Sequence, residues 1–276
     1  MPGPIPDDDG APLRLLTYLS PGLPFALYQL LGRYLAGRLD RPVSVASAPE
    51  GSGSGPRQGT PNPFATGGAD IGFVCAPSYR WLARAAEPTV ELVGAAPCHD
   101  DPRNAGHPVY YAVIVARAAL NLGSFEELAG RHVLFNDPSS LSGYHGLRDA
   151  LAAKNQRPEE VFASFRESGS HHRSLELIAR GHADAAAIDA NVWRSVEPVA
   201  GVAPVCTLGP FPIQPVVIRR ALSELRPPIC QALLEMHERP EGNALRQFGI
   251  ERFAPVSDAD YAGRTNSGSG NGVRWR

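Results

Sequence analysis

The chain of 276 residues is long enough to form one large domain or two modest ones. Its formal net charge is −2 at pH 7, so the chain lacks the basic excess of a nucleic-acid-binding surface. It also contains no run of about 18 apolar residues, the length needed to span a membrane. With 43% hydrophobic and 20% charged residues, the composition is that of a globular protein with a buried core.

The N-terminal residues 1–11 contain neither the basic segment nor the apolar core of a secretory signal. We therefore expect a cytoplasmic protein for the sequence as given, and a periplasmic or cell-surface protein if a leader precedes it. Residues 1–11 and the Ser/Gly/Asn/Arg-rich residues 263–276 are expected to be disordered tails. The four cysteines lack C-x-x-C spacing, so free buried thiols are expected.

The first third of the chain predicts strands alternating with helices. Residues 13–19 form an apolar run typical of a buried strand, and a helix with leucines on one face follows. Further strands are expected at residues 42–46 and 68–75. The Gly/Ser-rich residues 50–56 could bind phosphate, but they lack the Lys-Ser/Thr of a P-loop and the context of a dinucleotide fingerprint. A flexible connector is the favoured interpretation.

The middle of the chain predicts a long strand that could cross between two lobes. Residues 90–95 are strand-like, 97–108 form a polar loop, and 109–116 are an uninterrupted apolar run. A short helix at residues 125–129 then precedes a strand that ends at Phe135. The next nine residues, from Asn136 to Tyr144, are the most distinctive part of the sequence.

This serine-rich stretch contains three hydroxyls at the predicted start of a helix. The first N–H groups of a helix have no intrahelical partners, and the dipole there is positive, so an anion can bind without a lysine. The alternative is that Ser139, Ser140 or Ser142 merely caps the helix. Three hydroxyls beside a glycine favour an anion-binding cradle.

The second half of the chain repeats a step of the first half. Residues 181–189 and 68–75 both contain glycine, then Ala-Asp, then a strand of small or apolar residues. This repeat predicts two similar α/β lobes. A strand is also expected at 161–165, with helices at 222–238 and 242–248. Strands at 202–208 and 213–219 would return the chain to the first lobe.

Taken together, these motifs resemble the phosphonate/phosphate-type substrate-binding proteins of ABC importers. The resemblance extends over residues 12–261 and is carried by four stretches, residues 69–79, 137–144, 168–171 and 181–189. It implies an α/β, two-lobe type II periplasmic binding-protein fold with an interlobe cleft and two hinge strands. The implied boundaries are 12–108 and 209–262 for lobe 1, and 109–208 for lobe 2, with hinges near 109–115 and 208–213.

The resemblance also implies that the cleft closes over a small tetrahedral oxyanion such as phosphonate, phosphate or phosphite. Ser139, Ser140, Ser142 and His171 would hold the anion, and Asp189 would face a substrate amine. The full expected site is Ser139, Ser140, Ser142, Gly143, Tyr144, Ser170, His171, Tyr79, Tyr18, Tyr110 and Asp189. Tyr18 and Tyr79 could instead be core aromatics, and Asp189 could instead cap the next helix.

A solute-binding protein of this kind is expected to be a monomer that needs no cofactor and no metal, with an ABC permease as its partner in transport. The histidines at 171, 172 and 182 lack a carboxylate or thiol spaced to complete a metal site. The alternative is an enzyme on the same fold that acts on a small anionic substrate, with Cys75 as nucleophile and His171 as base. A cytosolic sensor or delivery protein is a third interpretation.

Overall fold

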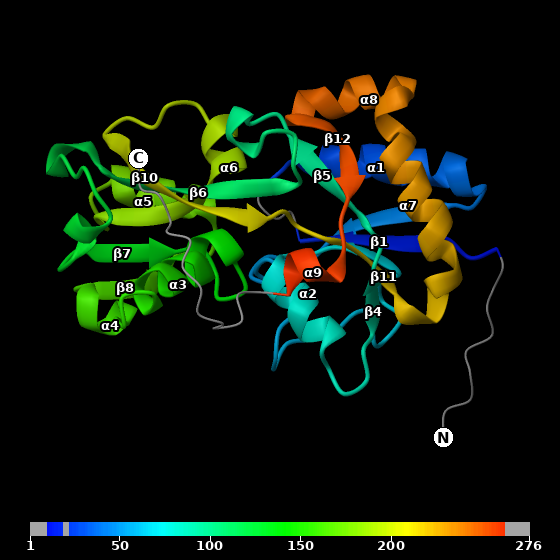
Figure 1. The fold of residues 1–276 in the computed structure, drawn as a ribbon, viewed down its shortest axis with the longest axis horizontal. Helices are drawn as coiled ribbons and strands as arrows, with labels where there is room; N and C mark the ends of the chain where they lie inside the picture. The colour runs from blue at the N-terminus through cyan, green and yellow to red at the C-terminus, as the bar shows by residue number, and fades with distance from the viewer. Residues whose placement is uncertain (1–9, 19–21, 263–276) are drawn as a thin grey trace.

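The computed structural model describes residues 10–18 and 22–262, in which two α/β lobes lie side by side (Figure 1). Apart from residues 10 and 11, the expected tails lie outside the described residues. The strands are β1 (Leu13–Thr17), β2 (Val43–Ser47), β3 (Ile71–Phe73), β4 (Val90–Leu92), β5 (Ala95–His99), β6 (Val109–Arg117), β7 (His132–Phe135), β8 (Ser164–Glu167), β9 (Ala185–Asp189), β10 (Val202–Pro212), β11 (Val216–Arg219) and β12 (Ile250–Pro255). The helices are α1 (Phe25–Leu39), α2 (Ala76–Ala83), α3 (Gly146–Ala152), α4 (Pro158–Val161), α5 (His171–Ala179), α6 (Ala190–Ser195), α7 (Arg226–Glu235), α8 (Pro240–Leu245) and α9 (Asp258–Tyr261).

The two five-stranded sheets have the same construction. The first has the order β2-β1-β3-β11-β4, and the second has the order β8-β7-β9-β6-β10. In each sheet the first three strands are parallel, and the fourth strand runs antiparallel to both of its neighbours. Strand β1 therefore corresponds to β7, β3 to β9, and β11 to β6. The predicted duplication is present as two copies of one sheet.

The repeated Ala-Asp step does the same work in each lobe. The carboxylate of Asp70, just before β3, accepts a hydrogen bond from a backbone amide in β1 (2.9 Å) and pairs with Arg219 on β11 (3.0 Å). The carboxylate of Asp184, just before β9, accepts from the first backbone amide of β7 (2.9 Å) and pairs with Arg117 on β6 (2.5 Å). Each aspartate thus ties its central strand to both neighbouring strands.

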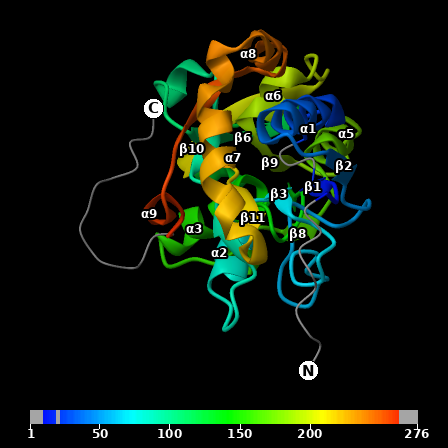
Figure 2. The ribbon, with the colours of Figure 1, turned by 90° about the vertical axis from the view of Figure 1, so that its right-hand side faces the viewer.

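The chain crosses between the two sheets through residues 100–108 and 213–215, which join β5 to β6 and β10 to β11. Helices α1 and α7 bury leucines against one face of the lobe 1 sheet, and α7 runs down the side of lobe 1 that Figure 2 presents. The buried cluster on the other face contains Cys75 and Tyr79, together with Tyr110 and Leu141 from lobe 2. The lobes therefore share a continuous apolar contact beside the serine-rich stretch.

Some predicted elements differ from the structure. Residues 95–99, mostly assigned to a loop, form β5, which pairs with β12 in a two-stranded ribbon that tolerates its prolines. The strand expected at 161–165 starts only at Ser164, because residues 158–161 form α4. The helix expected at 222–238 is interrupted, and α7 begins at Arg226 with prolines in its first turn. In the described part of the chain, no helix has both the length and the apolarity that crossing a bilayer requires.

Candidate ligand site between the lobes

The serine-rich stretch forms a tight helix start in lobe 2. Residues 141–145 make a π-helical turn that continues into α3, and Ser140 is the residue before it. The Ser140 hydroxyl oxygen accepts a hydrogen bond from the Gly143 amide (3.1 Å). Glycine is required at 143, because a Cβ there would lie 1.8 Å from the Asn136 Oδ1 atom. Ser140 therefore caps the helix, and its own proton has no acceptor among the described residues, so it can be donated to a ligand.

The buried carboxylate of Asp137 is the centre of the contacts between the lobes. It accepts hydrogen bonds from the Ser54 hydroxyl (2.6 Å) and the Ser54 amide (3.2 Å) of lobe 1. From lobe 2 it accepts hydrogen bonds from the Asn136 side-chain amide (2.7 Å), the Ser139 amide (2.8 Å) and the Ser139 hydroxyl. Neutral donors from both lobes thus converge on one negative group.

The Gly/Ser-rich loop at residues 50–56 is part of this junction, so the flexible-connector interpretation is wrong. Ser54 is only 6% exposed, and its amide also donates to the Ser139 hydroxyl oxygen (3.0 Å). Gly53 has a φ of 69°, and a Cβ there would lie 2.9 Å from oxygens of Asp137 and Ser139. The glycines permit a close approach of backbone to carboxylate. No pattern in the sequence pairs this loop with the serine-rich stretch, because the two lie about 80 residues apart in the chain.

Three further contacts lie near the serine-rich stretch, and the first and third of them join the lobes. The Leu141 amide donates to the Cys75 sulfur (3.3 Å). Tyr110 interacts with Ser142, and burial raises its pKa well above the usual value. The Gln214 side-chain amide, in the second crossing segment, donates to Asp189 (3.4 Å). Ser142 and Tyr110, both members of the expected site, therefore lie together.

His171 is the first residue of α5 and is 4% exposed. Burial lowers the pKa of His171 to about 4, although the nearby Asp137 carboxylate acts in the opposite direction. Its imidazole is therefore neutral at pH 7. The Nδ1 atom is buried and has no hydrogen-bond partner among the described residues. The ring also hydrogen-bonds to the backbone of Ala187. Because a neutral imidazole carries one proton, an N–H directed at Ala187 leaves Nδ1 as an acceptor, available to a donor group of a ligand.

Asp189 ends β9 and is completely buried. Its carboxylate accepts a hydrogen bond from the Asn191 amide (2.8 Å) at the start of α6, which is the capping role considered above. Burial raises the pKa of Asp189 to about 7. The side chain is therefore poised between its neutral and charged forms near neutral pH.

Four residues of the expected site make their contacts outside the Asp137 cluster. The Tyr79 hydroxyl donates to Asp258, and its ring packs edge-on against Tyr261. The Tyr144 hydroxyl accepts from Arg148 (3.0 Å), and its ring lies among aromatic side chains of lobe 2. Ser170 is exposed and caps α5. Tyr18 is partly buried against the cluster that contains Cys75. Tyr79 is buried in an apolar cluster, which agrees with its interpretation as a core aromatic.

The described residues contain no group of three or more His, Cys, Asp or Glu side chains placed to hold a metal ion. What the arrangement offers instead is hydroxyls, backbone amides and an imidazole, gathered where two similar lobes meet. Two duplicated lobes with polar donors at their junction define a solute-binding protein of the type II periplasmic binding-protein fold.

The comparison with protein families agrees with this assignment. The family described as "ABC transporter, phosphonate, periplasmic substrate-binding protein" matches residues 15–261. The chain therefore belongs to this family of solute-binding components of ABC transporters.

Solved structures share the fold at low sequence identity. PhnD1 from Prochlorococcus marinus, solved in complex with methylphosphonate, has a TM-score of 0.75 and 17% identity, covering 90% of this chain and 94% of that one. A binding-protein component of a phosphonate ABC transporter from Pseudomonas aeruginosa has a TM-score of 0.72 and 15% identity, covering 91% and 83%. A Xanthomonas citri protein solved with ATP has a TM-score of 0.67 and 17% identity, covering 91% and 93%.

Proposed function

We propose that this solute-binding protein takes a small tetrahedral oxyanion between its lobes, at the helix start that follows Ser140. The observation that carries the proposal is the convergence of neutral donors from both lobes on the Asp137 carboxylate. These donors are neutral, since no lysine or arginine pairs with Asp137 among the described residues, and the helix start after Ser140 adds backbone amides that can face an anion.

In this proposal the structure described here is the closed arrangement. Opening of the lobes would separate Ser54 from Asp137 and expose the serine-rich stretch. The anion would enter this open form, and the lobes would then close over it. The hydroxyls of Ser139, Ser140 and Ser142 and the first amides of the helix would donate to the anion, and the neutral His171 would contact a protonated oxygen of it. Gly143 would permit the approach, and Tyr110 would orient Ser142.

The lobe boundaries that we propose are residues 12–108 and 209–262 for lobe 1, and 109–208 for lobe 2. The second boundary falls inside β10, whose last residues still pair with β6. Bending is therefore expected around residues 213–215, after the paired part of β10 ends. The first hinge is proposed at the start of β6, near residue 109.

The ligand class is proposed to be phosphonate, phosphate, phosphite or a close analogue. Membership in the phosphonate family and the methylphosphonate bound to the Prochlorococcus marinus relative support this choice. The partner in transport would be an ABC permease, and the protein would act as a monomer.

An enzyme on the same fold is the less favoured alternative. It would need an activated nucleophile, and burial raises the pKa of Cys75 to about 12. The Cys75 sulfur already accepts a hydrogen bond from Leu141. A buried thiol with a raised pKa is typical of a packing role.

The test is to titrate the protein with phosphonate, phosphate, phosphite and sulfate, and to measure binding by calorimetry and by the shift in thermal unfolding. The Ser139→Ala/Ser140→Ala variant should bind roughly a hundredfold more weakly, because each hydrogen bond to a charged group contributes about 1.5–3 kcal/mol. Ser223→Ala is the matched control, since Ser223 is an exposed serine of lobe 1. The proposal fails if no oxyanion at millimolar concentration binds the wild type, or if the double variant binds as tightly as the wild type.

A further inference from the structure

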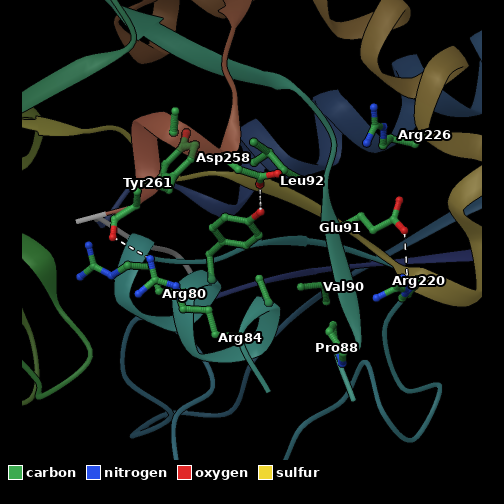
Figure 3. A pocket seen from close by; sticks show the side chains of 14 residues that line it. Arg80, Arg84, Pro88, Val90, Glu91, Leu92, Arg220, Arg226, Asp258 and Tyr261 are labelled. Carbon is green, nitrogen blue, oxygen red and sulfur yellow. Dashed lines mark hydrogen bonds and ion pairs between the residues drawn. The ribbon is translucent and has the colours of Figure 1, made fainter. Parts of the chain in front are cut away.

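A polar pocket lies in lobe 1, and no residue of the serine-rich stretch belongs to its lining (Figure 3). It is an open pocket of about 590 Å³ between α2, β4, the start of α7 and α9. We call it the arginine pocket, after Arg80, Arg84, Arg220 and Arg226, which line it together with Asp258 and Tyr261. None of the residues that contact Asp137 belongs to its lining.

The lining carries an excess of positive charge. Its four arginines face two carboxylates, those of Glu91 and Asp258. The Asp258 carboxylate is engaged by the Tyr79 hydroxyl, and the Glu91 carboxylate lies 3.7 Å from Arg220. Arg80 and Arg226 have no ion-pair partner within 4.0 Å among the described residues.

Two polar groups of the lining are at least partly buried, and the structure shows no ion pair for the first and no hydrogen bond for the second. Arg80 is partly buried, and loss of solvation lowers its pKa. The Tyr261 hydroxyl is buried and has no hydrogen-bond partner among the described residues. Removing a guanidinium from water without a matching anion is unfavourable, so an anion in the pocket would offset that cost.

The arginines are distributed over opposite sides of the pocket. Figure 3 shows Arg80 and Arg84 on one side, and Arg220 and Arg226 on the other. Arg84 also donates to the Ala262 carbonyl (2.7 Å), which joins α9 to the end of α2. A compact ion with a single charged group would meet one side only, whereas a molecule with separated anionic groups could meet both.

We propose that the arginine pocket binds a small molecule with two or more linked anionic groups, either a condensed phosphate or a polycarboxylate. The guanidinium fork matches both phosphate and carboxylate oxygens. The enclosed volume is within the usual range for small-molecule sites. Every residue of the lining belongs to lobe 1, and of its arginines Arg80 also interacts electrostatically with Asp149 of lobe 2.

The experiment is calorimetric titration of the full chain with tripolyphosphate and with citrate, which distinguish the two sources of charge. At least one should bind with a stoichiometry near one. Arg226→Gln and Arg220→Gln should each weaken that binding roughly five- to tenfold or more, since one charge-assisted contact is lost. Arg33→Gln removes an exposed arginine of α1 outside the pocket and should leave the affinity unchanged.

The Ser139→Ala/Ser140→Ala variant separates this site from the proposed oxyanion site. It should retain wild-type affinity for the polyanion. The inference is overturned if neither polyanion binds at millimolar concentration, if the serine variant loses the binding, or if Arg33→Gln weakens it as much as the pocket variants do. Circular dichroism of each variant checks that it is folded, and Arg226→Lys, which keeps the charge, should recover part of the affinity.

Discussion

At the scale of single residues, Asp137 accepts the largest number of hydrogen bonds at the lobe junction. Asp137→Ala would leave buried donors of Ser54, Ser139 and Asn136 without their acceptor. Each unsatisfied buried group costs about 1–3 kcal/mol, and water can replace some of the lost bonds. We expect the free energy of unfolding in urea to fall by about 2 kcal/mol or more. Asp137→Asn keeps one acceptor oxygen and should lose less; equal stability of the alanine variant and the wild type would contradict this role.

Asp189 provides a residue-scale prediction about pH. Burial raises its pKa to about 7 in the folded protein, against about 3.9 when unfolded. The folded state therefore binds the extra proton, so the stabilisation is complete below about pH 4 and is lost as pH rises through about 7. Relative to the wild type, Asp189→Asn should become more stable by about 1 kcal/mol per pH unit between pH 5 and 7.

The measurement is urea unfolding of the wild type and Asp189→Asn at several pH values. Asparagine preserves the capping acceptor for the Asn191 amide. His99 and His171, whose pKa values burial lowers to about 4, make both proteins less stable as pH falls below about 6.5, so their contribution cancels in the difference. A difference that does not change with pH would show that Asp189 is charged throughout.

At the scale of elements, the duplicated aspartates should each support one sheet only. Asp70→Ala removes the acceptor at the start of β1 and the partner of Arg219, while Asp184→Ala does the same for β7 and Arg117. Each change should lower the free energy of unfolding by about 2 kcal/mol. This value is below that of a fully buried ion pair, because the arginines are partly exposed to solvent. Hydrogen exchange should quicken in β1 and β3 for Asp70→Ala, and in β7 and β9 for Asp184→Ala. Equal acceleration in both lobes for either variant would rule out this independence.

The order of the elements was largely predictable because buried parallel strands leave short apolar runs in the sequence. The duplicated Ala-Asp step also indicated two similar lobes, and both sheets contain it. The ribbon of β5 and β12 was not predicted, since its strands contain Pro97 and Pro255 and lack a clear alternation. Proline is acceptable there because each strand pairs on one side only.

The candidate site was less predictable than the fold. The position of Ser139, Ser140 and Ser142 at a helix start followed from local sequence. The contact of Ser54 with Asp137 depends on residues far apart in the chain, so no local pattern indicates it. The Tyr79 hydroxyl donates to Asp258 on α9. This contact was not predicted, because helix α9 itself was not predicted.

At the scale of the whole molecule, the Ser54 contacts should bias the equilibrium between closed and open lobes. Ser54→Ala removes the hydroxyl that donates to Asp137 (2.6 Å). Loss of about 1.5–3 kcal/mol would shift the closed-to-open ratio by roughly ten- to a hundredfold. We expect a larger radius of gyration in X-ray scattering, which a saturating oxyanion should reduce again.

The control is Asp100→Asn, which removes the pair between Arg194 of α6 and the crossing segment (3.0 Å). Both of these side chains are partly solvated, and such pairs contribute about 0–1 kcal/mol. Its radius should therefore match that of the wild type. A similar increase in both variants, or none for Ser54→Ala, would mean that Ser54 does not control closure.

The placement of β11 between β3 and β4 has a consequence for the order in which the chain can fold during synthesis. Residues 93–215 are made after β4 and before β11, which takes on the order of ten seconds on a ribosome. Throughout that time β3 and β4 expose unpaired edges, a condition that favours aggregation. The second sheet, in contrast, is drawn from the continuous residues 109–212 and can be completed first. The nascent chain should therefore carry a finished lobe 2 beside an unfinished lobe 1, and a chaperone that binds exposed apolar strands would find its binding surface in the earlier segment.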